Sequence, residues 1–272
     1  MAKTNEVNLT LTTNELVATF ILTGYEDLAS QILNEQSLLT NEEELNRFIQ
    51  EASSSLAQKG FWAIDDDGEV REDVKALVQD LVQAERKARA VRMRDRSVLL
   101  LHYTSHEQVL IQRVEGKLHK FRYTTITHPF GELVKDFFST GSGNELEQEG
   151  IEVNPLQLSS SDFDDIHTTD PSVLEALVKD DAADLTMRAF AKAFLQNSQE
   201  LDNLSFMHSN YVEDQSVMEQ VIFLLPTPDF VWHIDYDQVN EDVIYAQPVS
   251  YSRYIDELER GIVQFFYHSY AR

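Results

Sequence analysis

The sequence predicts an α+β fold with two structurally similar halves, each built from an antiparallel sheet and flanking helices. Three observations support this prediction: helical periodicity dominates the first third of the chain, strand patterns occur in two separate clusters, and no helix-length segment interrupts either cluster. Parallel strands need a crossover connection of a dozen or more residues. The short connections within each cluster therefore predict antiparallel pairing.

The first part of the chain is predicted to be helical from about Thr12 to Arg92. Thr12 and Glu15 have the spacing of a capping box, in which the hydroxyl accepts from a backbone amide and the carboxylate accepts from the N-cap amide. Thr40 and Glu43 repeat this spacing ahead of another amphipathic segment. Both positions are therefore predicted helix starts.

A first cluster of strand patterns lies at residues 97–103, 108–114 and 117–127. The first segment is an aliphatic run, whereas the other two alternate apolar and polar residues, as half-buried strands do. Turn residues separate the segments, so they predict a three-stranded antiparallel meander. A helix is expected to begin near Phe130, directly after the meander.

A polar, glycine-containing segment at 141–161 is predicted to be a loop or linker, which divides the chain into halves at 1–140 and 162–272. In the second half, Asp170 and Pro171 are typical of a helix start, and the helix is expected to continue to about residue 199. Strands are expected at 204–212, 218–225, 230–236 and 243–247, and a final helix at 251–270.

Each half thus consists of helix, antiparallel strands and helix in the same order. The repeat of pattern predicts two halves related by a pseudo-two-fold axis, and we detect no repeat at the level of individual residues.

The composition is that of a folded, acidic protein. The chain has 272 residues, 42% of them hydrophobic, a formal net charge of −25 and no cysteine. Without cysteine there are no disulfides and no thiolate metal sites, which is typical of a reducing compartment. No apolar segment is long enough to span a membrane. We therefore expect a cytoplasmic protein. Its negative electrostatic field would repel nucleic acid, so we expect its partner to be a protein. The alternative is that the acidity serves solubility alone.

Patterns typical of enzymes are missing from the sequence. There is no G-x-S-x-G motif and no H-E-x-x-H motif, and His102 and His106 flank a strand end and a turn instead of sharing a helix face. The aspartates at 65–67 and 162–165 do not match a calcium-binding loop. We expect no catalytic residue, no metal and no cofactor, with an enzyme of unrecognised site as an alternative.

The most unusual local feature is basic. Six Lys or Arg side chains fall between Arg86 and Arg96, in a chain that has only 22. They either form a docking strip or pair internally, for instance with a helix C-terminus, and both interpretations stay open. The helices before them are similar in order to a winged helix, so an acidic regulatory protein is another alternative. The segment Thr40 to Gln58 is acidic, however, unlike a DNA-recognition helix.

Three segments carry a family resemblance: VNLTLTTNELVATFILTG, the meander SVLLLHYTSHEQVLIQRVEGKLHKFRYTTIT, and the region from LSFMHSNYV to QFFYHSYAR. Their order resembles the EspG-like family, cytosolic chaperones of type VII (ESX) secretion, and the acidic loops indicate a divergent Gram-positive relative. The resemblance implies a pseudo-two-fold α/β globule that keeps a helical-hairpin secretion substrate soluble for export. It carries over no particular binding residue.

Aromatic residues near the C-terminus are the predicted partner-binding site. Residues 230–236 alternate, which places several aromatics on one strand face, and the final helix adds more. Aromatic side chains are enriched at binding hot spots. The alternative is that they pack sheet against helix. The predicted site residues are Phe230, Trp232, Tyr236, Tyr245, Phe265 and Phe266.

Overall fold

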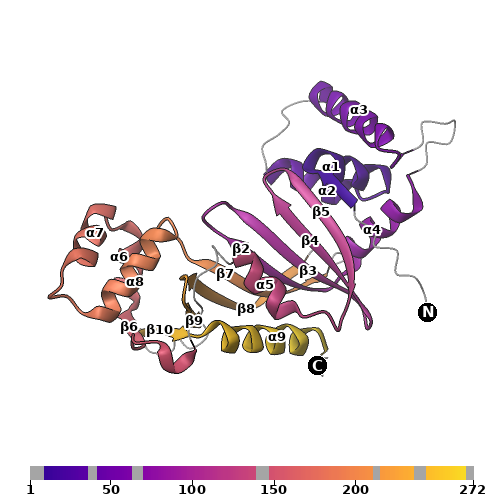
Figure 1. Cartoon of the computed structure of the whole chain (residues 1–272). Coiled ribbons are helices and arrows are strands. Elements are labelled where there is room, and N and C mark those ends of the chain that lie inside the picture. The colour runs from indigo at the N-terminus through magenta and orange to yellow at the C-terminus, as the bar shows by residue number, and fades with distance from the viewer. Residues whose placement is uncertain are drawn as a thin grey trace. The chain divides into compact units, whose positions relative to one another are not determined.

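The structure is a computed structural model that describes residues 9–35, 42–62, 70–138, 147–210, 215–235 and 243–267 (Figure 1). Its ten strands form one sheet in the order β1-β5-β4-β3-β2-β7-β8-β9-β10-β6, and the strand pairs are antiparallel. The predicted α+β class with antiparallel pairing is therefore confirmed. By contacts, the chain divides into one compact unit of residues 1–85 and 102–124 and a second of residues 86–101 and 125–272. We call these unit 1 and unit 2.

Unit 1 is a layer of helices on one face of a small sheet (Figure 1). Its helices are α1 (Thr13–Leu22), α2 (Glu26–Glu35), α3 (Glu42–Gln58) and α4 (Glu72–Gln83). Its strands are β1 (Leu9–Thr12), β4 (Gln108–Glu115), β5 (Leu118–Thr125) and the end of β3 (Ser97–Ser105). The core joins apolar faces of the four helices to the inward faces of β1, β4 and β5, and Tyr123 of β5 donates to Asp80 of α4 at 2.6 Å.

Unit 2 covers both faces of its sheet with helices. Its strands are β2 (Arg86–Arg92), β6 (Leu156–Ser159), β7 (Asp202–Asn210), β8 (Gln215–Pro226), β9 (Val231–Asp235) and β10 (Val243–Val249). Its helices are α5 (Phe130–Phe138), the 3-10 turn η1 (Gln148–Gly150), α6 (Ser160–Thr168), α7 (Pro171–Lys179), α8 (Leu185–Gln196) and α9 (Tyr251–Tyr267).

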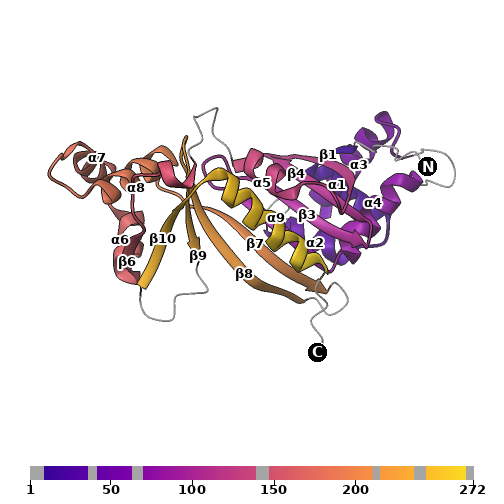
Figure 2. The same ribbon diagram turned by 60° about the horizontal axis from the view of Figure 1, so that its bottom comes forward.

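Different helices cover the two faces of the sheet in unit 2. On one face, α9 lies along the strands with α5 beside it (Figure 2), and Phe265 of α9 contacts Phe206 of β7 with ring centroids 5.1 Å apart. On the other face, the helices α6 and α8 pack on β9 and β10 through a second core cluster. The helices α5 and α9 approach closely at Gly131, where a Cβ would collide with the backbone oxygen of Ile255.

The order of elements repeats in part along the chain, and two strand-to-helix corners are alike. A short strand, LTLT in β1 and LQLS in β6, pairs with the last strand of its own meander, β5 or β10. Each strand runs directly into a helix through a capping box, Thr12 with Glu15 and Ser159 with Asp162. The two strand-to-helix corners thus share a local pattern of strand and capping box. The pseudo-two-fold axis stays a prediction.

Several expected boundaries differ from the structure. The segment 141–161, expected to be a linker, contains η1 and β6, and the compact units do not follow the expected halves at 1–140 and 162–272. Residues 86–92, expected to end a helical region, form β2, because their alternate residues Ala88 and Ala90 are buried on one face. The helix expected from 171 to 199 is two helices, α7 and α8. Thr40 and the turn at 65–68 lie outside the described residues.

Candidate functional site

The predicted aromatic site does not form one surface. Trp232 and Phe266 are fully buried, at 0% exposure, whereas Phe230 and Phe265 are half-buried and Tyr245 is 43% exposed. Tyr236 lies outside the described residues. In this structure a partner can therefore reach Tyr245, but it cannot reach Trp232 or Phe266.

Trp232 is a core residue of unit 2. Its ring meets Phe190 of α8 and Phe230 in edge-on contacts, with centroids 5.4 Å apart in each pair. Such pairs add to the free energy gained from burying the rings. The alternative interpretation, that these aromatics pack sheet against helix, describes Trp232 and Phe266.

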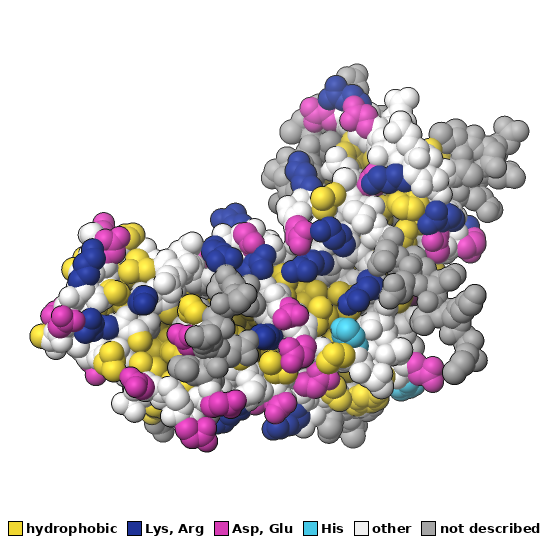
Figure 3. Space-filling view, viewed as in Figure 1, with side chains coloured by type: hydrophobic (Ala, Val, Ile, Leu, Met, Phe, Trp, Pro, Cys, Tyr) yellow, Lys and Arg dark blue, Asp and Glu magenta, His cyan; other side chains and the backbone are white. Residues whose placement is uncertain are grey.

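The helical pair α7 and α8 carries large apolar side chains on its surface. Val173 in α7 is 57% exposed and Leu185 in α8 is 55% exposed. In Figure 3, apolar side chains show at the surface where Figure 1 places α7 and α8. In α7, all of which the structure describes, Leu174 is the one buried residue. Leu177 and Val178 are half-buried against the core of unit 2, so Val173 is the large apolar side chain that α7 leaves exposed.

Local sequence signals fix the two helices. Asp170 caps α7 by accepting from the amide of Ser172 at 2.8 Å, and Asp184 caps α8 by accepting from the amide of Met187 at 2.9 Å. Arg188 of α8 donates to the backbone oxygen of Val178 at 3.2 Å, which ties α8 to the end of α7. The sequence prediction missed these exposed apolar positions because it treated α7 and α8 as one long helix. Asp184, a typical N-cap residue, could have indicated that a second helix starts there.

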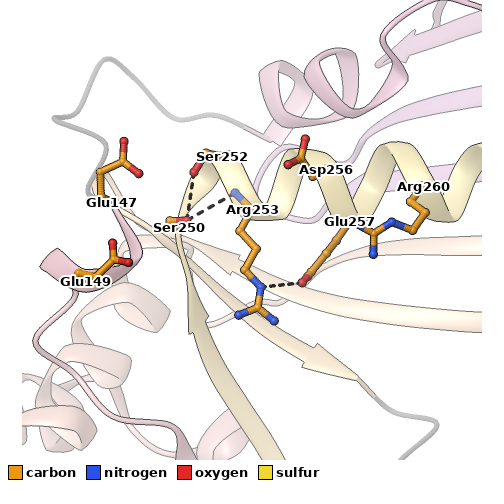
Figure 4. A pocket seen from close by; sticks show the side chains of 8 residues that line it. All are labelled: Glu147, Glu149, Ser250, Ser252, Arg253, Asp256, Glu257 and Arg260. Carbon is orange, nitrogen blue, oxygen red and sulfur yellow. Dashed lines mark hydrogen bonds and ion pairs between the residues drawn. The ribbon is translucent and has the colours of Figure 1, made fainter.

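A polar recess of about 470 Å³ lies beside the start of α9 (Figure 4). Two acidic residues line the recess on one side: Glu149 in η1 and Glu147 just before it. On the other side, α9 contributes Arg253, Asp256 and Arg260. Arg253 pairs with Glu257 at 2.8 Å, one turn along the same helix. Because these charged side chains are largely exposed to water, the recess lacks the desolvated, mainly apolar lining of small-molecule sites.

Two arginines of the basic cluster serve the fold of unit 2. Arg86 donates to the backbone oxygen of Phe266 at 2.5 Å, at the C-terminal end of α9. Arg92 donates to the backbone oxygen of Phe137 at 2.7 Å, at the end of α5, and pairs with Asp95. Cations are favourable there because helix carbonyls at the C-terminus are unpaired and the helix dipole is negative. The internal interpretation therefore holds for Arg86 and Arg92.

Unit 1 buries polar groups as a connected chain of hydrogen bonds. Gln112 lies 2.9 Å from His102 through its oxygen and 2.9 Å from His119 through its nitrogen, and the far nitrogen of His119 lies 3.1 Å from the hydroxyl of Thr13. The hydroxyl of Thr13 donates onward to the backbone oxygen of Lys117 at 3.4 Å. Because the hydroxyl of Thr13 donates its proton to Lys117, His119 must donate to Thr13 with one ring nitrogen and accept from Gln112 with the other. Burial lowers the pKa of His119, in keeping with a neutral ring.

Glu15 is the buried carboxylate of unit 1 and is also fully engaged. It accepts from the amide of Thr12 at 2.7 Å, from the hydroxyl of Ser55 at 2.6 Å and from the ammonium of Lys59 at 2.7 Å. Burial by itself would raise the pKa of Glu15, but the hydrogen bonds outweigh it and hold the pKa below its usual value. The capping box thus joins α1 to the end of α3.

Unit 2 buries polar atoms that have no hydrogen-bond partner among the described residues: one carboxylate oxygen of Asp202, the hydroxyl of Tyr254 and the indole nitrogen of Trp232. The other oxygen of Asp202 accepts from the amide of Met93 at 2.8 Å and from Asn197 at 3.3 Å. Burial raises the pKa of Asp202 to about 6 despite these hydrogen bonds. Burial also raises the pKa of Tyr254.

Neither a metal site nor a membrane span is found in the part of the chain that the structure describes. No three His, Asp or Glu side chains gather there in a metal-binding arrangement, and no helix is long and apolar enough to cross a bilayer. No protein-family model matches the sequence, and comparison with curated proteins finds no match.

Proposed function

We propose that this protein is a cytosolic chaperone or adaptor that binds helical-hairpin substrates of type VII secretion and keeps them soluble for export. The supporting observation is the apolar surface of α7 and α8, where Val173 and Leu185 are more than half exposed. Contiguous exposed apolar surface marks interaction sites in soluble proteins, whereas single exposed apolar residues are common without such a role. The family resemblance supplies the substrate class.

A helical surface suits a helical substrate. An amphipathic helix presents apolar residues at helical spacing, and it buries them best against another helix or a groove between helices. A substrate hairpin laid against α7 and α8 would remove Val173 and Leu185 from water. The net charge of −25 supports the role because it opposes aggregation of a protein that exposes apolar surface.

Co-purification from the native host tests this function. The full-length tagged protein is expected to retain a helical-hairpin secretion substrate, identified by mass spectrometry, and the double variant Val173→Asp/Leu185→Asp is expected to lose it. The matched control is Val217→Asp/Met218→Asp, since Val217 and Met218 of β8 are 58% and 51% exposed. Equal loss in both variants, or capture only of proteins unrelated to secretion, would contradict the proposal.

A further inference from the structure

Charge is separated along the strands of this protein. Residues 86–125, which include β2 to β5, contain ten Lys or Arg and three Asp or Glu, for a net charge of +7. Residues 193–252, which include β7 to β10, contain ten Asp or Glu and no Lys or Arg, for a net charge of −10. A strongly acidic protein thus keeps nearly half of its 22 basic side chains in one segment.

Four basic side chains of unit 1 lie on the β4–β5 hairpin. Leu118, Lys120 and Arg122 alternate along β5 and therefore point to one face of the sheet. Arg113 of β4 shares that face, because Arg113 and Lys120 both contact the carboxylate of Glu115, at 3.2 and 2.8 Å. The intervening Phe121 is buried in the helix-covered core, so this face is the one away from the helices of unit 1. We call Arg113, Lys117, Leu118, Lys120 and Arg122 the cationic surface.

The cationic surface is accessible and only partly neutralised. The side chains of Arg113 and Lys120 are 42% and 51% exposed, and Leu118 between the charges is 42% exposed. Within the described part of the chain, Lys117 and Arg122 have no carboxylate at salt-bridge distance, whereas Arg113 and Lys120 pair with Glu115. Exposed ion pairs of this kind stabilise a fold only modestly, and the four cations together keep a net positive charge.

We propose that the cationic surface binds an acidic, amphipathic segment of a partner protein. The cations would pair with its carboxylates and steer its approach, and Leu118 would contact its apolar side, since apolar anchors ringed by charge are typical of interfaces. A protein segment is favoured over nucleic acid because the net charge of −25 repels a polyanion at long range, whereas a short acidic segment bears few charges.

This surface goes beyond the proposed function because it needs a second partner. The surface of α7 and α8 in unit 2 is apolar, whereas the cationic surface in unit 1 is mainly electrostatic. One chain would therefore carry a substrate on one unit and engage an acidic protein with the other, as an adaptor does. The two bindings can be lost separately, so failure of one does not imply failure of the other.

Fluorescence anisotropy with the full-length protein tests the proposal. The probe is a fluorescein-labelled helical peptide of Glu and Leu, with a Gln-for-Glu peptide and a single-stranded DNA oligonucleotide as comparison probes. We expect the acidic peptide to bind and to weaken roughly tenfold when salt is raised several-fold, because exposed charges are screened. Lys117→Glu/Lys120→Glu is expected to weaken binding by roughly tenfold or more, and Leu118→Ser by a few-fold.

The matched control is Arg94→Glu/Lys192→Glu, which makes the same change in net charge at two exposed positions of unit 2. We expect it to change binding less than twofold. The milder variant Lys117→Gln/Lys120→Gln repeats the test if the reversal disturbs folding, which circular dichroism checks. Absence of binding, equal weakening by the control, or equal binding of the Gln peptide would overturn the proposal. Tighter binding of the oligonucleotide would assign the surface to nucleic acid instead.

Discussion

Units 1 and 2 are built from similar elements but differ in how each holds its buried carboxylate. In unit 1, the carboxylate of Glu15 and the side chains of Gln112 and His119 have hydrogen-bond partners. In unit 2, Asp202 and Tyr254 keep buried polar atoms without partners among the described residues. An unsatisfied buried polar atom costs its desolvation energy, whereas a satisfied one stabilises modestly. Unit 1 therefore depends on polar contacts, and unit 2 depends on its aromatic core in spite of its polar groups.

Removal of Trp232 is expected to have the largest effect. Trp232→Ala deletes a fully buried ring from the core of unit 2 and should lower the free energy of unfolding by about 3–5 kcal/mol. Trp232→Phe keeps most of the packing and removes the unpartnered indole N–H, so it should cost about 1.5 kcal/mol or less. Urea denaturation followed by circular dichroism measures both. A small loss of unfolding free energy in Trp232→Ala would mean that the stability of unit 2 does not depend on this core.

The two capping boxes offer a matched comparison between the units. Glu15→Ala leaves Lys59 and Ser55 without their carboxylate partner and should cost about 2–3 kcal/mol, because it removes three hydrogen bonds made by a buried charged group. Asp162→Ala removes an exposed capping residue at the corresponding point of unit 2 and should cost about 1 kcal/mol or less. Thermal unfolding of the two variants checks the ranking. Equal losses of stability in the two variants would show that the burial of Glu15 adds nothing to the stabilisation from its capping box.

Asp202 should make unit 2 less stable as the pH rises. Its pKa of about 6 in the folded state lies above the usual 3.8, so the folded state binds more protons, and stability falls as the pH rises from about 4 through 6. Asp202→Asn should therefore stabilise unit 2 at pH 7 by about 1–2 kcal/mol and have little effect near pH 4. Urea titrations read by Trp232 fluorescence in a Trp62→Phe background measure this. Destabilisation at pH 7 would show that Asp202 has a charged partner.

His119 should give unit 1 the opposite pH dependence, with the smallest effect. Its pKa is lowered from the usual 6.5, so the unfolded state binds more protons, and stability is lost as the pH falls below 6.5. Protonation would also direct an N–H at the amide nitrogen of Gln112. We expect a loss of stability between pH 7 and pH 5, read by Trp62 fluorescence in a Trp232→Phe background.

His119→Asn should flatten this pH dependence, and the exposed His106→Asn should leave it unchanged. If His106→Asn flattens the profile equally, the hydrogen-bonded chain is not its source. Parallel pH profiles of the two tryptophans would show that the units do not respond separately.

The site could be predicted from the sequence only in part. The alternation at 230–236 correctly indicated a strand with an aromatic face, now β9, and the periodicity of 251–270 indicated α9. Alternation separates two faces of a strand but does not show whether a second element covers each face. Because Phe190 of α8 packs on Trp232 and Phe130 of α5 packs on Phe266, both are core residues, while Val173 is exposed.

The sequence by itself determined the antiparallel α+β class, the capping box at Thr12 and Glu15, most strand positions and the acidic charge, because these depend on spacing between near neighbours. The tertiary structure alone decided that Arg86 to Arg92 forms a strand and that its end arginines cap α5 and α9. It also decided which buried polar groups find partners. These outcomes depend on contacts between segments far apart in the chain, as between Arg86 and Phe266, which local periodicity does not encode.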